Sequence, residues 1–197
     1  MQVMILLAHP DPGSFNHAIS HRAADACRHL GHDVTTHDLH AEGFPALLPA
    51  SEIPREGGLE PVISSHCAEL ATADAIIVVH PNWWGMPPAI LKGYVDRVFR
   101  PGVAYEFEEG DCGEGTPIGL LKATVALVFN TSNTAAQREL DVFGDPLDTL
   151  WRNCIFGLCG VPDVRRSIFE TVCTSTLTQR KRWLDEVEQV VLEALSE

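Results

Sequence analysis

Three short, nearly unbroken apolar runs constrain the fold of this chain more than any other feature of its sequence. They cover residues 2–8, 75–79 and 124–129. A run of this kind, without polar residues at alternate positions, is typical of a strand covered on both faces, as in a parallel sheet. Segments with helical spacing of apolar residues separate the runs, so the connections are right-handed crossovers. The sequence predicts an α/β protein of about five parallel strands in three layers, with one domain over residues 1–197.

Weaker signals place the other elements. Further strands are expected at residues 32–39 and 165–170, and helices at residues 15–30, 62–71, 88–99, 146–158 and 178–195. Two segments rich in Pro, Gly and Glu, residues 41–61 and 102–119, are expected to be surface excursions, the second with a small hairpin at residues 103–107.

Composition excludes several classes of function. The formal net charge of -13 argues against a nucleic-acid surface, which needs clustered Lys and Arg. No apolar run approaches the roughly 20 residues of a membrane span, and the first strand has no basic segment before it, so we expect no membrane insertion and a cytoplasmic protein. The six scattered cysteines are then expected to be reduced, and the nine histidines to be mostly solvated, with no metal site.

The loop after the first strand leads directly into a helix N-terminus. Its candidate ligand residues are His9, Ser14, Phe15 and Asn16. Unpaired N–H groups and the helix dipole favour a phosphate at such a place. The loop has neither the glycines of a dinucleotide fingerprint nor the lysine of a P-loop. An ordinary helix capped by Ser14 is the alternative interpretation.

Two further loops leave the predicted sheet edge at the carboxyl ends of strands, where ligands bind in folds of this class. One could wall a flat aromatic ligand, and its residues are Pro81, Asn82, Trp83, Trp84 and Gly85. The other offers neutral polar groups, and its residues are Asn130, Thr131, Ser132 and Asn133. The alternatives are that both indoles are core, and that the third loop is only a turn before a helix. If the three loops converge, they combine a phosphate-binding helix N-terminus, aromatic side chains for a flat ring and neutral polar groups for its edge. A binding site for flavin mononucleotide has these three features.

The motifs in these loops resemble those of the flavodoxin-like NAD(P)H:quinone oxidoreductases. The resemblance is carried by HPDPGSFN from His9, by PNWWGMPPAILKGYVDRVF from Pro81, and by the Ala104-Tyr105 pair that follows. It implies a doubly wound sheet of order 2-1-3-4-5, a bound flavin (FMN or FAD), NAD(P)H as co-substrate and a homodimer with its sites at the interface. By resemblance, the three loops hold the flavin, residues 92–99 contribute to the dimer face, and Tyr105 and Phe107 overhang the substrate pocket.

One departure from the family pattern concerns the proton relay. The family's tyrosine and histidine positions fall on Gln137 and Phe143 here, so that relay is not carried over. The expected function remains two-electron, ping-pong reduction of quinones or similar flat electrophiles, because the flavin carries the electrons. The alternatives are a flavodoxin-type electron carrier and an ancillary regulatory subunit of a membrane transporter. A hydrolase is disfavoured because Ser14 is not in a G-x-S-x-G elbow.

Overall fold

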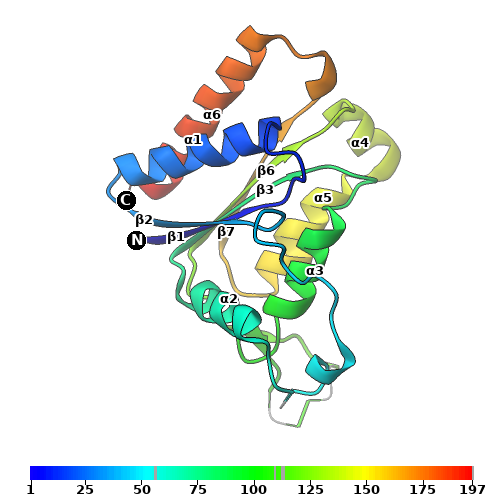
Figure 1. The fold of residues 1–197 in the computed structure, drawn as a ribbon. Coiled ribbons are helices and arrows are strands. Elements are labelled where there is room, and N and C mark those ends of the chain that lie inside the picture. Colours follow the sequence, from blue (N-terminus) through cyan, green and yellow to red (C-terminus); the bar gives the residue numbers. More distant parts are fainter. Residues whose placement is uncertain (56, 109, 112–113, 197) are drawn as a thin grey trace.

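A twisted, five-stranded parallel sheet forms the middle layer of the computed structural model, which describes residues 1–197 except 56, 109, 112–113 and 197 (Figure 1). The strand order is β2-β1-β3-β6-β7, which confirms the predicted 2-1-3-4-5 order of a flavodoxin-like fold, because β4 (Tyr105–Glu106) and β5 (Ile118–Gly119) lie outside this sheet. The strands are β1 Gln2–Leu7, β2 Asp33–Asp38, β3 Ala75–Pro81, β6 Val125–Thr131 and β7 Asp163–Phe169. The chain runs from β1 to β2 on one side and then crosses to β3 on the other side of β1. The direction of strand order therefore switches between β1 and β3, and folds of this class bind ligands at the carboxyl end of such a switch point.

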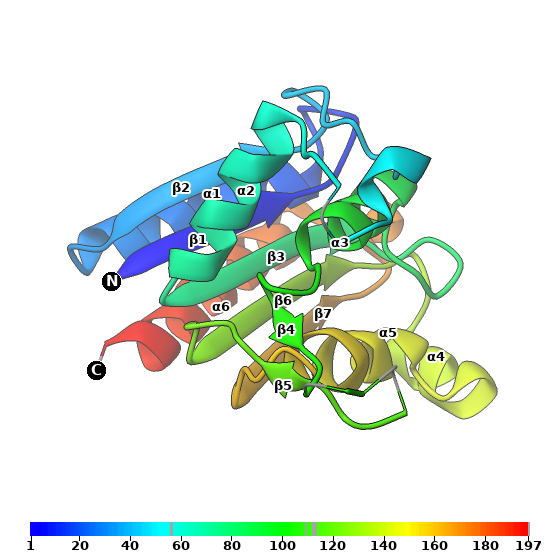
Figure 2. The ribbon, with the colours of Figure 1, turned by 90° about the horizontal axis from the view of Figure 1, so that it is seen from below.

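Helices cover both faces of the sheet (Figures 1 and 2). One face carries α1 (Phe15–His29) and α6 (Leu177–Leu195), which pack against each other. The opposite face carries α2 (Pro61–Thr72), α3 (Ala89–Val98) and α5 (Pro146–Thr149). Alternate residues of each strand point to the two faces, so the sheet is the wall between two apolar clusters. Among the described residues, no helix has the length and apolar character required to cross a membrane.

Local chemistry explains where the helices begin and end. Ser14 caps α1 by accepting a hydrogen bond from the His17 N–H, and Gly31 ends the helix in the left-handed region at φ 80°. Pro61 occupies the first turn of α2, where its missing N–H costs nothing. Thr176 caps α6 in the same way as Ser14 caps α1, through the N–H of Gln179.

The structure corrects several details of the predicted elements. Helix α4 (Ala136–Phe143) was not predicted, and the helix after Pro146 continues from α5 as π-helical turns over Leu150–Gly157. The hairpin is not confined to residues 103–107, since β4 (Tyr105–Glu106) pairs with β5 (Ile118–Gly119) across the excursion. The residue 41–61 segment is not purely a surface excursion, because Glu52 within it is buried against Arg97.

The prediction of solvated side chains fails for several histidines. His17, His37, His66 and His80 are all buried. Of the cysteines, Cys27, Cys67 and Cys159 are buried free thiols, whereas Cys154 and Cys173 are exposed, and Cys112 lies outside the described residues. The packing that buries these imidazoles joins segments that are distant in the sequence, so no local pattern revealed it.

Candidate functional site

The three predicted loops meet at the carboxyl edge of the sheet and enclose a cavity of about 160 Å³, the polar slot. Hydrogen bonds across the strand ends hold the loops together. The Asn82 N–H donates to the Thr131 carbonyl at 2.6 Å, and the Asn16 amide donates to Thr131 Oγ1 at 3.0 Å. The lining residues are His9, Ser14, Phe15, Asn16, Pro81, Asn82, Trp83, Thr131, Ser132, Asn133 and Val172. The predicted convergence of the loops is therefore confirmed.

One end of the polar slot is the N-terminus of α1. The first turn of this helix contains no acidic side chain, so its dipole is uncompensated there. Among the described residues, the Phe15 and Asn16 N–H groups have no hydrogen-bond acceptor. Partial burial lowers the pKa of the neighbouring His9, which favours its neutral form. This end of the slot has the donor set that a phosphate group requires.

Ser14 is held in place by a partly buried chain of hydrogen bonds, the relay, which the sequence did not reveal. Its Oγ lies 2.9 Å from His17 Nδ1, and His17 Nε2 lies 3.0 Å from Asp38 Oδ2. Partial burial alone would raise the pKa of Asp38, but hydrogen bonds from the Ala41 N–H, from His17 and from the His40 N–H together lower it. An ionised Asp38 accepts from His17 Nε2, so Nδ1 is the acceptor for the Ser14 hydroxyl. The relay fixes the rotamer of Ser14 at the rim of the slot.

The second loop keeps one indole in solvent. Trp84 is 101% exposed and has φ 61°, a left-handed conformation that costs a bulky residue about 1–3 kcal/mol. Gly85 follows at φ 69°, and its N–H donates to Asn82 Oδ1 at 2.9 Å. A Cβ on Gly85 would lie 2.9 Å from Pro146 Cγ. The structure therefore excludes the alternative in which both indoles are core.

Trp83 has a different role from Trp84. Its ring lines the polar slot and lies 6.1 Å from that of His9. The main-chain N–H of Trp83 donates to the Met86 carbonyl at 3.0 Å, and the main-chain N–H of Met86 donates to the Trp83 carbonyl. The main-chain N–H of Trp83 is thus engaged within the loop, and it is the ring of Trp83 that faces the slot.

A wider cavity of about 430 Å³ adjoins the polar slot and shares Asn82, Ser132 and Asn133 with it. We call it the outer cavity. Its other lining residues are Trp84, Gly85, Thr134, Arg138, Glu139, Phe143 and Pro146. The two cavities together run from a helix N-terminus to a pair of exposed aromatic rings. Such a shape suits a ligand with an anionic end and a flat, apolar end.

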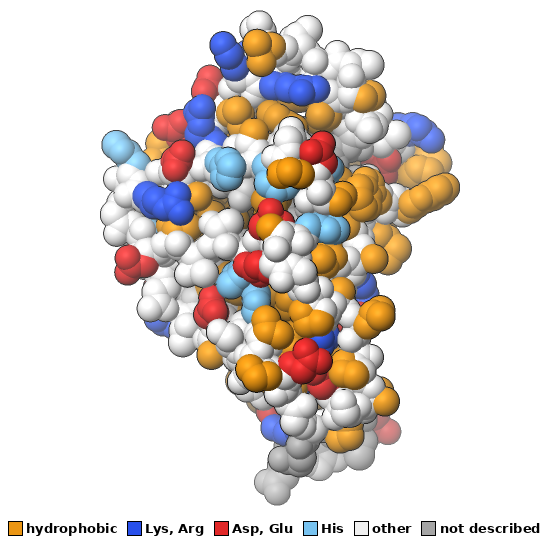
Figure 3. Space-filling view, in the orientation of Figure 1, with side chains coloured by type: hydrophobic (Ala, Val, Ile, Leu, Met, Phe, Trp, Pro, Cys, Tyr) orange, Lys and Arg blue, Asp and Glu red, His pale blue; other side chains and the backbone are white. Residues whose placement is uncertain are grey.

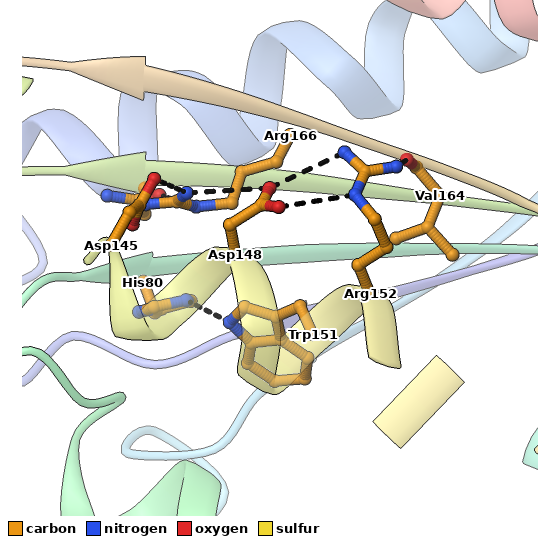
Figure 4. Close-up of polar contacts among 8 residues, drawn as sticks. His80, Asp145, Asp148, Trp151, Arg152, Val164 and Arg166 are labelled. Carbon is orange, nitrogen blue, oxygen red and sulfur yellow. Dashed lines mark hydrogen bonds and ion pairs between the residues drawn. The ribbon is translucent and has the colours of Figure 1, made fainter. Parts of the chain in front are cut away.

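Asn130 does not line either cavity, although it was a predicted site residue. Its amide oxygen accepts a hydrogen bond from Arg166 Nε at 2.7 Å. Arg166, on β7, also donates to Asp145 at 2.7 Å (Figure 4). Asp145 lies between the outer-cavity residues Phe143 and Pro146, so this network supports the cavity from beneath the sheet edge.

Tyr105 and Phe107, the predicted substrate-pocket residues, lie away from both cavities of their own chain. Their rings contact each other at 5.7 Å, and Tyr105 lines a separate cavity near Phe99 and Arg100. Of the two positions that replace the family's tyrosine and histidine, Phe143 lines the outer cavity. Gln137 instead donates to Asp141 on the surface of α4.

Several lining residues were not predicted from the sequence. Val172 follows β7, so the rule that placed the other loops could have indicated this one as well. Thr134 precedes α4, and Arg138 and Glu139 lie in it. The range of this helix was not predicted from the sequence. The helix is weakly marked in the sequence because α4 has only eight residues and its N-cap residue, Ala135, has no side chain that could cap it.

Comparison with known proteins agrees with this geometry. A family model described as flavodoxin-like fold matches residues 1–191. An uncharacterised NAD(P)H oxidoreductase of Haemophilus influenzae is 34% identical over 174 residues, 86% of this chain and 83% of that protein. The NAD(P)H dehydrogenase [quinone] 1 of Rattus norvegicus is 32% identical over 214 residues, 96% of this chain and 77% of that protein.

A solved structure shares the fold over the full length. The FMN-dependent NADH-azoreductase of Bacillus anthracis, determined in complex with FMN, has a TM-score of 0.80 and 16% identity, and the match covers 100% of both chains. The motifs, the strand order, the converging strand ends and the two relatives agree. The chain is an oxidoreductase, and it belongs to the flavodoxin-like family of NAD(P)H:quinone oxidoreductases.

Proposed function

We propose that the protein is a flavin-dependent NAD(P)H oxidoreductase that reduces quinones or similar flat electrophiles by a two-electron, ping-pong reaction. One observation carries the proposal: two adjoining cavities, which share Asn82, Ser132 and Asn133, lie between the free N–H groups of α1 and the exposed rings of Trp84 and Phe143. A flavin nucleotide has the matching parts, a phosphate and a planar ring system. The relatives named as NAD(P)H oxidoreductases support the same chemistry.

Different residues of the chain would bind different parts of the flavin. The first turn of α1, with Ser14 and Asn16, would hold the phosphate, and Pro81 and Trp83 would flank the ring. Ser132 and Asn133 would bind its polar edge with hydroxyl, amide and main-chain groups. The bound flavin would supply hydride transfer from NAD(P)H and onward to the acceptor. The protein positions both partners and excludes water from the face where they meet.

The acceptor end of the site requires a second chain in this proposal. Within one chain the outer cavity is open beside the fully exposed Trp84. Apolar side chains gather along the edge of the molecule that carries α3 and α4 (Figure 3). Exposed apolar residues of this kind include Leu47, Ile53, Met86 and Phe143. We infer that a homodimer through this edge would place the partner's Tyr105 and Phe107 over the cavity, because within one chain these two residues lie away from it. We also propose that the protein is cytoplasmic.

The first test is spectroscopic. Purified protein should show a flavin absorption spectrum, or gain one with added FMN or FAD, and mass spectrometry of the released cofactor would identify it. NADH or NADPH should bleach the flavin rapidly under anaerobic conditions. Initial rates with a quinone should give parallel double-reciprocal lines. A colourless protein that takes up neither flavin contradicts the proposal.

The same measurements separate the alternatives. An electron carrier would bind flavin but would be bleached negligibly by NAD(P)H. An ancillary transporter subunit would co-purify with a membrane partner. Sedimentation of the loaded protein as a monomer, with full activity, would contradict the shared site.

A further inference from the structure

A compact cluster of imidazoles and carboxylates lies away from both cavities. It joins the end of β2, the turn that follows and α2, through His37, Glu42, His66 and Glu69. On the face shown in Figure 3, imidazole and carboxylate side chains lie side by side near the middle of the molecule. None of the four residues lines the polar slot or the outer cavity. The cluster therefore calls for an explanation apart from flavin chemistry.

Both ring nitrogens of His37 face carboxylate oxygens. Its Nδ1 lies 3.0 Å from Glu42 Oε1, and its Nε2 lies 2.9 Å from Glu69 Oε2. A neutral imidazole carries one N–H and can donate to only one of these carboxylates. The other nitrogen then presents a lone pair to a carboxylate, which is repulsive unless a cation lies between them. The cation is either a second proton or a metal ion.

His66 favours the metal ion. Its side chain is 5% exposed, and its ring lies 4.2 Å from that of His37. Its Nδ1 has no hydrogen-bond partner among the described residues, and its Nε2 lies 3.8 Å from Glu42 Oε2, beyond hydrogen-bond reach. A buried imidazole without a hydrogen bond is rare in a folded protein. A second proton on His37 gives neither nitrogen of His66 a partner, whereas an ion held by Glu42 would bind His66 Nε2.

The distances suit a small divalent cation. One ligand atom from each of His37, Glu42 and His66 lies within 4.8 Å of the others. Two ligands of a tetrahedral zinc ion lie about 3.3 Å apart, given bonds of about 2.0–2.1 Å. The separation from His37 Nδ1 to Glu42 Oε1 is 3.0 Å and that from His66 Nε2 to Glu42 Oε2 is 3.8 Å, so one is below this value and the other above it. Glu42 has a side chain 36% exposed, so it can rotate to improve the geometry.

Glu69 then takes the place of an outer carboxylate. If His37 Nδ1 binds the ion, His37 Nε2–H donates to Glu69 Oε2, which fixes the tautomer and the ring plane. The Ser65 hydroxyl donates to the other Glu69 oxygen at 3.1 Å, so this carboxylate is itself oriented. The double charge of the ion balances the two carboxylates.

We propose that His37, Glu42 and His66 form a binding site for a zinc-like divalent transition metal, with Glu69 as a positioning residue. Two imidazoles and one carboxylate are ligands that zinc accepts, and a water molecule would complete the tetrahedron. The ion ties β2 and the turn after it to α2, so its role is to clamp the segment that leads into residues 41–61.

The test is a zinc titration of the full-length, tag-free protein after dialysis against a chelator. Competition with a chromophoric chelator should reveal one Zn²⁺ per chain, with a Kd of about 1 µM or tighter. His66→Ala should weaken binding at least about a hundredfold, and Glu69→Gln about ten- to a hundredfold. His21→Ala, which removes an exposed histidine from α1, is the matched control and should bind zinc as the parent does.

Glu42→Gln guards against variants that fail to fold, because Glu42 lies in a partly exposed turn. This variant should keep the parent circular dichroism and lose the thermal stabilisation by Zn²⁺. Co²⁺ added to the parent should produce visible absorption bands of a tetrahedral site, and these should be absent in His66→Ala. No stoichiometric uptake of Zn²⁺ or Co²⁺ by the parent, or unchanged uptake by both His66→Ala and Glu42→Gln, overturns the proposal. In the first case a proton alone occupies the cluster.

Discussion

The indole N–H of Trp151 donates to Nε2 of His80 at 3.0 Å, inside the protein and beneath the second loop (Figure 4). This bond fixes the tautomer of His80, so its proton is on Nδ1, which donates to the Pro81 carbonyl at 2.8 Å. Pro81 lines the polar slot. The pair therefore connects the core to the wall of the candidate flavin site.

The neutral state of His80 makes stability depend on pH. Burial lowers its pKa to about 4. Between pH of about 6.5 and 4 the unfolded chain binds a proton at this imidazole and the folded chain does not, so unfolding is favoured as the pH falls through that window. The loss approaches about 3 kcal/mol by pH 4. Urea unfolding of the parent and of His80→Gln at pH 7 and pH 5 would measure it.

The variant should be less stable at pH 7 and should show a smaller change between the two pH values. His21→Gln, in which the imidazole replaced is exposed, should retain the parent's pH dependence. Equal pH dependence of the parent and His80→Gln would contradict the assignment.

Arg166→Met tests the support beneath the outer cavity. The Arg166 side chain is 5% exposed and binds Asp145 at 2.7 Å, so its removal leaves a partly buried carboxylate unpaired. We expect a loss of about 3 kcal/mol in the free energy of unfolding, and a lower kcat/KM because Phe143 and Pro146 lose their support. Arg165→Met is the control, since its exposed pair with Asp163 contributes about 0.5 kcal/mol or less. Similar losses in the free energy of unfolding of the two variants would contradict the role of Arg166 as the support of the outer cavity.

Ser14→Ala separates capping from ligand binding. Loss of the cap should cost about 1 kcal/mol of stability, and loss of the hydroxyl should weaken FMN binding. Thr176→Ala removes the matching cap of α6, whose hydroxyl accepts from the Gln179 N–H at 3.2 Å. It should cost similar stability with unchanged FMN affinity. Fluorescence titration with FMN and urea unfolding would distinguish the two variants, and unchanged FMN affinity in both would exclude Ser14 from the seat.

Trp84→Asn should separate stability from function. Asn tolerates the left-handed conformation, and the indole buries nothing in the single chain, so stability should stay the same or rise by about 1 kcal/mol. Turnover of the acceptor should fall about tenfold because an aromatic wall is lost. Trp84→Phe should retain most of the activity. A large loss of stability in Trp84→Asn would show that the ring is packed, against the structure.

The sequence by itself determined the elements that local chemistry controls. Apolar runs long enough for buried strands, helical spacing between them and the cap at Ser14 predicted a parallel sheet and the edge where its loops meet. The prediction was correct because burial of a strand on both faces and N-capping of a helix depend on residues that are neighbours in the sequence. The position of His9, Trp83 and Ser132 around one slot then followed from a topological rule.

Tertiary structure decided which way the side chains of those loops face. Asn130 and Thr131 are adjacent and point to opposite sides of β6, one to Arg166 and the other to Asn16. Trp83 and Trp84 are adjacent, and only the left-handed turn at Trp84 sends its ring into solvent. His37 and His66 meet because α2 packs beside β2, across many intervening residues. Contacts of this kind depend on how distant segments pack, and no pattern in neighbouring residues encodes them.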